Sequence, residues 1–254
     1  MINPFDYPLL VLLLSLPAFW FSGLLGASFR KRRVELAEGT RDDLTFVLGG
    51  ALTLLALITG FTFSMAVNRY DQRKNYEEDE ANAIGTEYAR ANFLPSADAA
   101  EVRALLKSYL DERILHYRIR RGNQAMIRES DARTARLQAE MWSTVATPTA
   151  PPNPVTTFVA SGMNDVLNSQ GRAQAAWRNR IPTAAWTLLI VISIFCNFLI
   201  GYSAHGRNPS LLLVLPVALS ISLFLIADID SPRGGIISVR PENLQSLAES
   251  LNAR

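Results

Sequence analysis

The stretch LTFVLGGALTLLALITGFTFSMAV, from Leu44 to Val67, decides the fold of this chain. It contains no Asp, Glu, Lys or Arg. A helix needs roughly 20 consecutive apolar residues to cross a hydrocarbon core of about 30 Å. We therefore expect this stretch to cross a membrane as a helix, which makes the chain an integral membrane protein.

Three further stretches without charged side chains have a similar length, and they are Tyr7–Phe29, Ile181–Ala204 and Asn208–Ala227. Basic residues directly follow the first stretch, at 30–33, whereas a signal peptide carries its positive charge before the apolar segment. We therefore expect the first stretch to stay as a membrane anchor. The sequence predicts an all-α protein with four transmembrane helices.

The segment between the second and third stretches, residues 68–180, is polar and holds 16 Lys or Arg against 14 Asp or Glu. The whole chain of 254 residues has a net charge of +2, without the one-signed basic face of a nucleic-acid-binding protein, so we expect no nucleic-acid partner. We expect four regions: transmembrane helices one and two (1–67), an extramembrane helical bundle grown from spans two and three (68–180), transmembrane helices three and four (181–227), and a C-terminal turn with an amphipathic tail (228–254).

The second span has no proline and no break at its end, so its helix is expected to continue to Phe93 and to stop at Leu94-Pro95. A residue before proline is pushed away from the helical conformation. This gives one helix of about 50 residues.

The rest of the bundle is predicted from helical periodicity. A helix starts at Ser96 or Asp98, where Asp98 and Glu101 have the spacing of a capping box. Further helices cover about 124–146 and about 155–180, the last leading directly into span three, with the proline-rich segment 148–154 as an exposed connector. The expected core side chains are Val102, Leu105, Leu106, Tyr109, Leu137, Met141, Trp142, Val145, Phe158, Met163, Val166 and Leu167.

Signatures of an enzyme are missing from the sequence. The two histidines are His116 and His205, the one cysteine is Cys196, and no H-E-x-x-H, G-x-S-x-G, P-loop or G-x-G-x-x-G pattern occurs. A single cysteine rules out an intrachain disulfide and a cysteine-ligated metal cluster. We expect no catalytic residue, no metal site and no cofactor.

The second span carries a stripe of small residues within an arc of about 80° on a helix that turns about 100° per residue. Its members are Gly49, Thr53, Ala56, Gly60 and Ser64. Such a stripe either lets another helix pack closely or forms the wall of a pore, and both interpretations stay open.

A second stripe lies beside it and includes Phe61 and Met65. In an oligomer these two side chains would form an apolar constriction that gates by dewetting, whereas in a packed helix they face lipid or span four. On the far side of the helix we expect Thr62 to face lipid.

Polar positions outside the spans are also expected to pack. Gly85 lies inside a helix, where glycine costs about 1 kcal/mol, so we expect another element to approach it closely. Asp228 and Asp230 follow the fourth stretch, where they either bind ions or pair with Arg69 or Arg73, and we prefer the pairing.

Several segments resemble a bacterial membrane family described as bestrophin-like. They are Gly60-Phe61-Thr62-Phe63-Ser64-Met65-Ala66, Arg69 through Arg73, Glu80-Ala81-Asn82-Ala83-Ile84-Gly85-Thr86, Leu94-Pro95 and Asp230-Ser231-Pro232-Arg233-Gly234-Gly235. The resemblance covers nearly the whole chain. It implies structural roles for Arg69, Arg73, Glu80, Asn82, Gly85, Asp230, Pro232 and Gly234.

The resemblance implies a function as well. Bestrophins are pentameric anion channels in which the second span lines the pore neck, so we expect a homo-oligomer in the lipid bilayer. We also expect a multi-pass protein of the bacterial inner membrane. The acidic run that forms the calcium clasp of the animal channels is missing here, so calcium gating does not carry over. The alternative is a non-conducting sensor or scaffold whose helical domain binds a soluble partner that the sequence does not identify.

The side of the membrane that holds the helical domain is left open. Five Lys or Arg in the short loop 30–43 favour a cytoplasmic loop and hence a helical domain outside the cytoplasm, whereas the resemblance to bestrophins implies a cytosolic domain.

Overall fold

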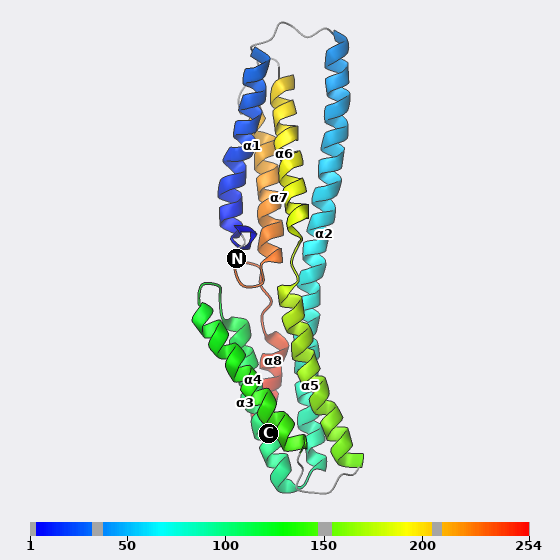
Figure 1. Ribbon diagram of the computed structural model, residues 1–254, viewed down its shortest axis with the longest axis vertical. Helices are drawn as coiled ribbons and strands as arrows, with labels where there is room; N and C mark the ends of the chain where they lie inside the picture. Colours follow the sequence, from blue (N-terminus) through cyan, green and yellow to red (C-terminus); the bar gives the residue numbers. More distant parts are fainter. Residues whose placement is uncertain (1–3, 32–37, 147–153, 205–209, 254) are drawn as a thin grey trace. The chain divides into compact units, whose positions relative to one another are not determined.

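The computed structural model describes residues 4–31, 38–146, 154–204 and 210–253. Within these ranges the chain is helical and contains no strand. The α-helices are α1 (Pro8–Lys31), α2 (Glu38–Arg90), α3 (Ser96–Arg118), α4 (Gln124–Ala146), α5 (Pro154–Arg178), α6 (Thr183–Ser203), α7 (Val214–Asp230) and α8 (Glu242–Asn252) (Figure 1).

The long second helix is confirmed. α2 has 53 residues and is followed by one 3-10 turn, Ala91–Phe93. Leu94 then adopts an extended backbone with φ −81° and ψ 160°, because Pro95 follows it. The next helix starts at Ser96, as predicted, but its N-cap is Pro95, which makes no capping hydrogen bond, and Asp98 lies inside the first turn. The predicted capping box is therefore wrong.

Among the described residues, three stretches are long and apolar enough to cross a membrane, and they are Pro8–Arg30, Asp42–Phe93 and Pro154–Ser203. α7 is equally apolar but has 17 residues, and the start of the predicted fourth stretch, 208–209, lies outside the described residues. The structure thus supports an all-helical membrane protein with three candidate spans.

The expected continuous passage from α5 into α6 is wrong. α5 ends at Arg178 and α6 begins at Thr183, with Pro182 as its N-cap at φ −57° and ψ 141°. Proline has no N–H to donate and disfavours helix at the residue before it, so the helix is interrupted there.

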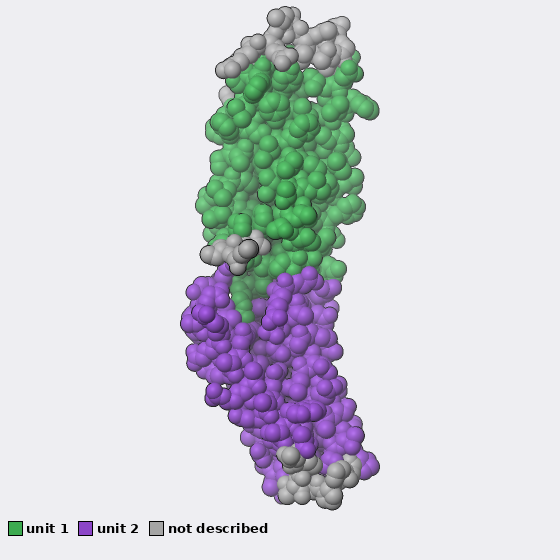
Figure 2. Space-filling view, in the orientation of Figure 1, with its two compact units in different colours: residues 1–69, 180–238 green, residues 70–179, 239–254 purple. Residues whose placement is uncertain are grey.

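Two compact units divide the chain (Figure 2). Unit 1 comprises residues 1–69 and 180–238, and in it α1 packs along α6 and α7. Glycines let the backbones of α1 and α6 meet: a Cβ on Gly26 would collide with the carbonyl oxygen of Phe198, and a Cβ on Gly201 with that of Gly23. This is close small-residue packing of membrane helices.

Unit 2 comprises residues 70–179 and 239–254 and contains the C-terminal part of α2 with α3, α4, α5 and α8. Most of the expected core side chains lie in its core, including the fully buried Val102, Leu106, Tyr109, Met141, Met163 and Val166. Phe158 and Trp142 are exceptions, since 47% and 43% of their surfaces are exposed. The proline-rich connector lies outside the described residues except for Pro154, which begins α5.

Candidate functional site

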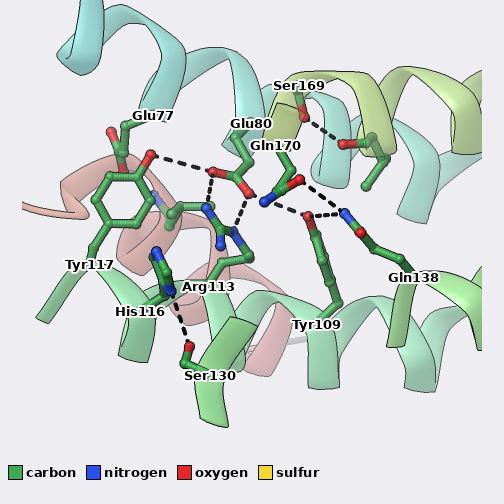
Figure 3. Close-up of polar contacts among 12 residues, drawn as sticks. Glu77, Glu80, Tyr109, Arg113, His116, Tyr117, Ser130, Gln138, Ser169 and Gln170 are labelled. Atoms are coloured by element: carbon green, nitrogen blue, oxygen red, sulfur yellow. Dashed lines mark hydrogen bonds and ion pairs between the residues drawn. The ribbon is translucent and has the colours of Figure 1, made fainter. Parts of the chain in front are cut away.

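The core of unit 2 contains a buried polar network around Glu80 (Figure 3). α2 supplies Glu80, and α3 supplies Tyr109, Arg113 and Tyr117 at intervals of four residues. Side chains four apart lie on one helical face, so all three α3 residues meet the same carboxylate.

The carboxylate of Glu80 accepts from all three of these side chains. Arg113 donates through Nε to Oε1 and through Nη2 to Oε2 at 3.4 Å, while the hydroxyls of Tyr109 and Tyr117 donate to Oε1 and Oε2 at 3.4 Å each. Glu80 and Arg113 have side-chain exposures of 0% and 3%, so neither charge is stable there without the other.

Charges and burial shift the pKa values of the groups around Glu80. Burial and the charge of Glu80 raise the pKa of Tyr109 and of Tyr117 well above the usual range. Burial lowers the pKa of Arg113, but the charge of Glu80 and its hydrogen bond outweigh this effect and raise that pKa. Tyr109 and Tyr117 therefore stay neutral and Arg113 stays charged at physiological pH, which suits a structural role.

His116 lies beside Ser130 and Asp131, a combination that invites comparison with a catalytic triad. Its Nδ1 is 3.1 Å from Ser130 Oγ and 3.7 Å from Asp131 Oδ1. A triad histidine uses one ring nitrogen for each partner, whereas here both partners meet the same nitrogen. Ser130 is also completely buried, so this cluster offers no accessible nucleophile.

α8 is attached to α2 by a carboxylate that the sequence did not single out. Glu77 accepts from the backbone N–H of Leu244 at 2.9 Å and from Asn243 Nδ2 at 2.7 Å, which satisfies one backbone N–H in the first turn of α8. Burial raises the pKa of Glu77. A Cβ on Gly85 would lie 3.0 Å from Leu247 Cδ1, which confirms the predicted close approach at Gly85.

Asp230 joins three segments of unit 1 and is 1% exposed. It accepts from Arg180 Nε at 3.0 Å and from the N–H of Ile181 at 3.3 Å, and it lies 3.9 Å from Arg69 Nη1. The predicted pairing with Arg69 is observed. Arg180 also pairs with Asp6, so the junction contains balanced charges.

The segment after α7 folds back on Asp228, which accepts from the N–H groups of Ile236 and Ile237 at 2.7 Å each. A Cβ on Gly235 would collide with the carbonyl oxygen of Asp228, so glycine is required there. The N–H of Gly234 donates to Ser231 Oγ at 3.2 Å.

Three other residues of the family motifs lie near these sites in sequence. Arg73 is buried at 2% exposure, Pro232 is half-buried, and Asn82 is exposed.

The face of α2 that carries the small-residue stripe is exposed in the part of the chain that the structure describes. All seven candidate pore or packing residues are exposed, namely Gly49, Thr53, Ala56, Gly60, Phe61, Ser64 and Met65. A Cβ added at Gly49 or Gly60 would meet nothing within 4 Å among the described residues. Only 6% of the residues in the apolar part of α2 are buried, against 22% in α1.

The opposite face of α2 packs inside unit 1. Leu55, Thr62 and Ala66 have exposures of 2%, 4% and 0%. The expectation that Thr62 faces lipid is therefore wrong, and its hydroxyl donates to the carbonyl of Ile58 at 2.8 Å. Thr53 on the exposed stripe likewise donates to its own helix, at Gly49 O, 2.9 Å away.

A groove of about 430 Å³ borders the stripe in unit 1. Its lining from α2 includes Ala56 and Gly60, and its lining from α7 includes Ala218 and Ser222. Among the described residues, no three His, Cys, Asp or Glu side chains gather as a metal site requires.

These features define a helical membrane protein with a polar helical domain and one exposed small-residue helix face. The family model described as the Bestrophin-like domain matches residues 12–244, so the chain belongs to that family. No curated protein sequence matches the chain.

Solved structures share the fold. A bacterial bestrophin homologue from Klebsiella pneumoniae, solved by Zn-SAD phasing, is similar with a TM-score of 0.64 and 14% identity over 96% of this chain and 95% of that one. A mutant of the Klebsiella homologue matches with a TM-score of 0.63 and 13% identity over 97% and 98% of the two chains. A structure described as a membrane protein has a TM-score of 0.66 and 12% identity over 97% of each chain.

Proposed function

We propose that this protein forms a homo-oligomeric ion channel in the bacterial inner membrane, with α2 lining the pore or the subunit contacts. The exposed stripe on α2 carries the proposal. A Cβ on its glycines would meet nothing among the described residues, whereas Gly23, Gly26 and Gly201 serve packing between α1 and α6. A small-residue face without an intrachain partner suits a second copy or a lumen.

Membership of the Bestrophin-like family supports the proposal, because bestrophins, which the chain resembles, are anion channels. Phe61 and Met65, at 69% and 39% exposure, then form an apolar constriction next to the stripe. The family motifs around Glu80, Gly85 and Asp230 are proposed to maintain the structure around the pore rather than to line it.

Four membrane crossings are part of the proposal. α7 spans about 26 Å at 1.5 Å per residue, and the 3-10 turn Leu211–Leu213 extends it. Its 17 residues contain no charge before Asp228. We place residues 68–180 outside the bilayer as one helical domain and leave its side open.

The mass of the purified particle in detergent tests the proposal. We expect a multiple of the 28.1 kDa chain, together with ion flux when the particle is placed in liposomes. A monomer would end the pore model, because one α2 helix cannot enclose a lumen.

The second candidate is a non-conducting sensor or scaffold. It is favoured by the side chains of the stripe, which carry no charge, and by the hydroxyl of Thr53, which is satisfied inside its own helix. Intact oligomers without flux would select this candidate.

A further inference from the structure

Glu87 is an unusual carboxyl group in unit 2. Its side chain has 0% exposure, and neither of its oxygens has a hydrogen-bond partner among the described residues. Buried polar atoms normally have such partners, as Glu77 and Glu80 do on the same helix. A carboxyl without donors is far more stable in its neutral form than as an ion.

Helix α5 provides the space for this carboxyl at Gly162. A Cβ at this position would collide with Glu87 Oε2 and with Arg90 Nη1. Glycine costs about 1 kcal/mol inside a helix, so its presence in the middle of α5 fits a need for this close contact. Glu87 therefore lies where α2 and α5 pack against each other.

Two charged groups face Glu87, one from each helix. Arg90 of α2 has its Nη1 3.8 Å from Glu87 Oε2, and Asp165 of α5 has its Oδ2 3.8 Å from the same Nη1. The guanidinium of Arg90 lies over the ring of Phe158 at 4.4 Å. The connector 147–153 contains no ionisable side chain.

We propose that Glu87 is a proton-sensitive latch between α2 and α5. In its neutral form the carboxyl packs against Gly162 and the two helices stay together. When it ionises, a charge without hydrogen-bond donors competes with Asp165 for Arg90, and the contact between the helices loosens. The latch belongs to the helical domain and does not depend on whether the protein conducts ions.

The pKa of Glu87 gives the pH range. Burial raises it to about 7 from the ordinary value of 4.5, Arg90 opposes the rise and Asp165 adds to it. Because the folded-state pKa is raised, the stabilisation is complete below pH 4.5 and is lost as the pH rises through 7. Linkage predicts that local opening becomes about 10- to 100-fold more favourable between pH 5 and pH 8.

Hydrogen exchange of the full chain in detergent tests the latch. Peptides from the N-terminal half of α5, Pro154–Gln170, are followed between pH 5 and pH 8.5 after correction for intrinsic exchange. We expect their protection to fall as the pH rises from 5 to about 7 in the wild type and to change little above that pH. Glu87→Gln, which is neutral at every pH, should remove the fall and keep α5 protected at pH 8.

Two further variants keep the test decisive. Asp165→Asn, at a side chain 63% exposed, should move the midpoint of this fall to lower pH because a repelling charge is removed. Glu78→Gln, on the exposed side of α2, should leave the midpoint unchanged. Histidines ordinarily change charge between pH 5 and 8, so they are the alternative source of a pH-dependent fall in protection. A fall in protection that persists in Glu87→Gln, or a midpoint that Asp165→Asn does not move, would overturn the proposal.

Discussion

The buried pair of Glu80 and Arg113 shows how strongly a single residue can affect the stability of the helical domain. Each charge is buried, and each is tolerated because the other is present. Replacing one partner leaves an uncompensated buried charge, which costs more than the ion pair contributes while both are intact.

Glu80→Ala should therefore lower the free energy of unfolding of the helical domain by about 3–5 kcal/mol. Glu78→Ala, two positions away on the exposed side of α2, should change it by less than about 0.5 kcal/mol. Denaturant unfolding in detergent, followed by the helical signal, measures both. A double variant, Glu80→Leu with Arg113→Met, should be less harmful than Glu80→Ala alone. Equal losses in Glu80→Ala and Glu78→Ala would contradict the buried pair.

At the scale of elements, the glycines of the membrane helices fall into two groups. Those of α1 and α6 touch a neighbouring backbone, whereas Gly49 and Gly60 of α2 face away from the rest of the chain. Glycine is thus expected to stabilise the single subunit in α1 and α6 and the oligomer in α2.

Gly201→Leu should destabilise the subunit, because its side chain would collide with the backbone of α1. Gly60→Leu should leave subunit stability nearly unchanged and lower the mass of the particle, since bulk at this position forces neighbouring copies apart. Thermal unfolding and light scattering in detergent separate the two effects. If Gly60→Leu keeps the wild-type mass, the stripe is not at a subunit contact.

Helices were predictable here because their signals are local. The end of α2 follows from Leu94-Pro95, and the buried face of α3 follows from the spacing of Val102, Leu106 and Tyr109. The end of the fifth helix near residue 180 and a kink at Pro182 were expected, whereas the non-helical residues 179–182 between α5 and α6 were not.

Of the pairings between distant residues, the sequence predicted that of Asp230 with Arg69 but not the others. Glu77 binds α8 across a separation of 167 residues, and Asp230 binds Arg180 across 50. The family motifs pointed to Glu80 and Gly85 without naming their partners. The side of α2 that faces protein was misassigned at Thr62, because both faces of a membrane helix are apolar and periodicity alone does not separate lipid from protein.

For the whole molecule, membrane topology is the first quantity to measure. Four crossings place Thr149 and the C-terminus on one side of the membrane and the loop after Arg33 on the other. Reporter fusions at Thr149, after Arg33 and after Arg254 measure this directly. Opposite sides for Thr149 and the C-terminus would mean that α7 does not cross, and the four-span proposal would be wrong.

Whether the protein conducts ions is tested most directly by a substitution at Phe61. If its ring narrows a pore, Phe61→Ala removes apolar bulk from the constriction and lowers the barrier to wetting, so anion flux through proteoliposomes should rise several-fold. Phe21→Ala is the matched control, because Phe21 is an exposed aromatic on α1, at 60% against 69% for Phe61, and it should leave flux unchanged. Particle mass is measured in parallel, since a rise in flux carries meaning only for an intact oligomer. If oligomers of unchanged mass conduct neither as wild type nor as Phe61→Ala, the channel hypothesis is wrong and the scaffold hypothesis remains. The exposed ring of Phe61 would then serve only to pack α2 against lipid or a neighbouring copy.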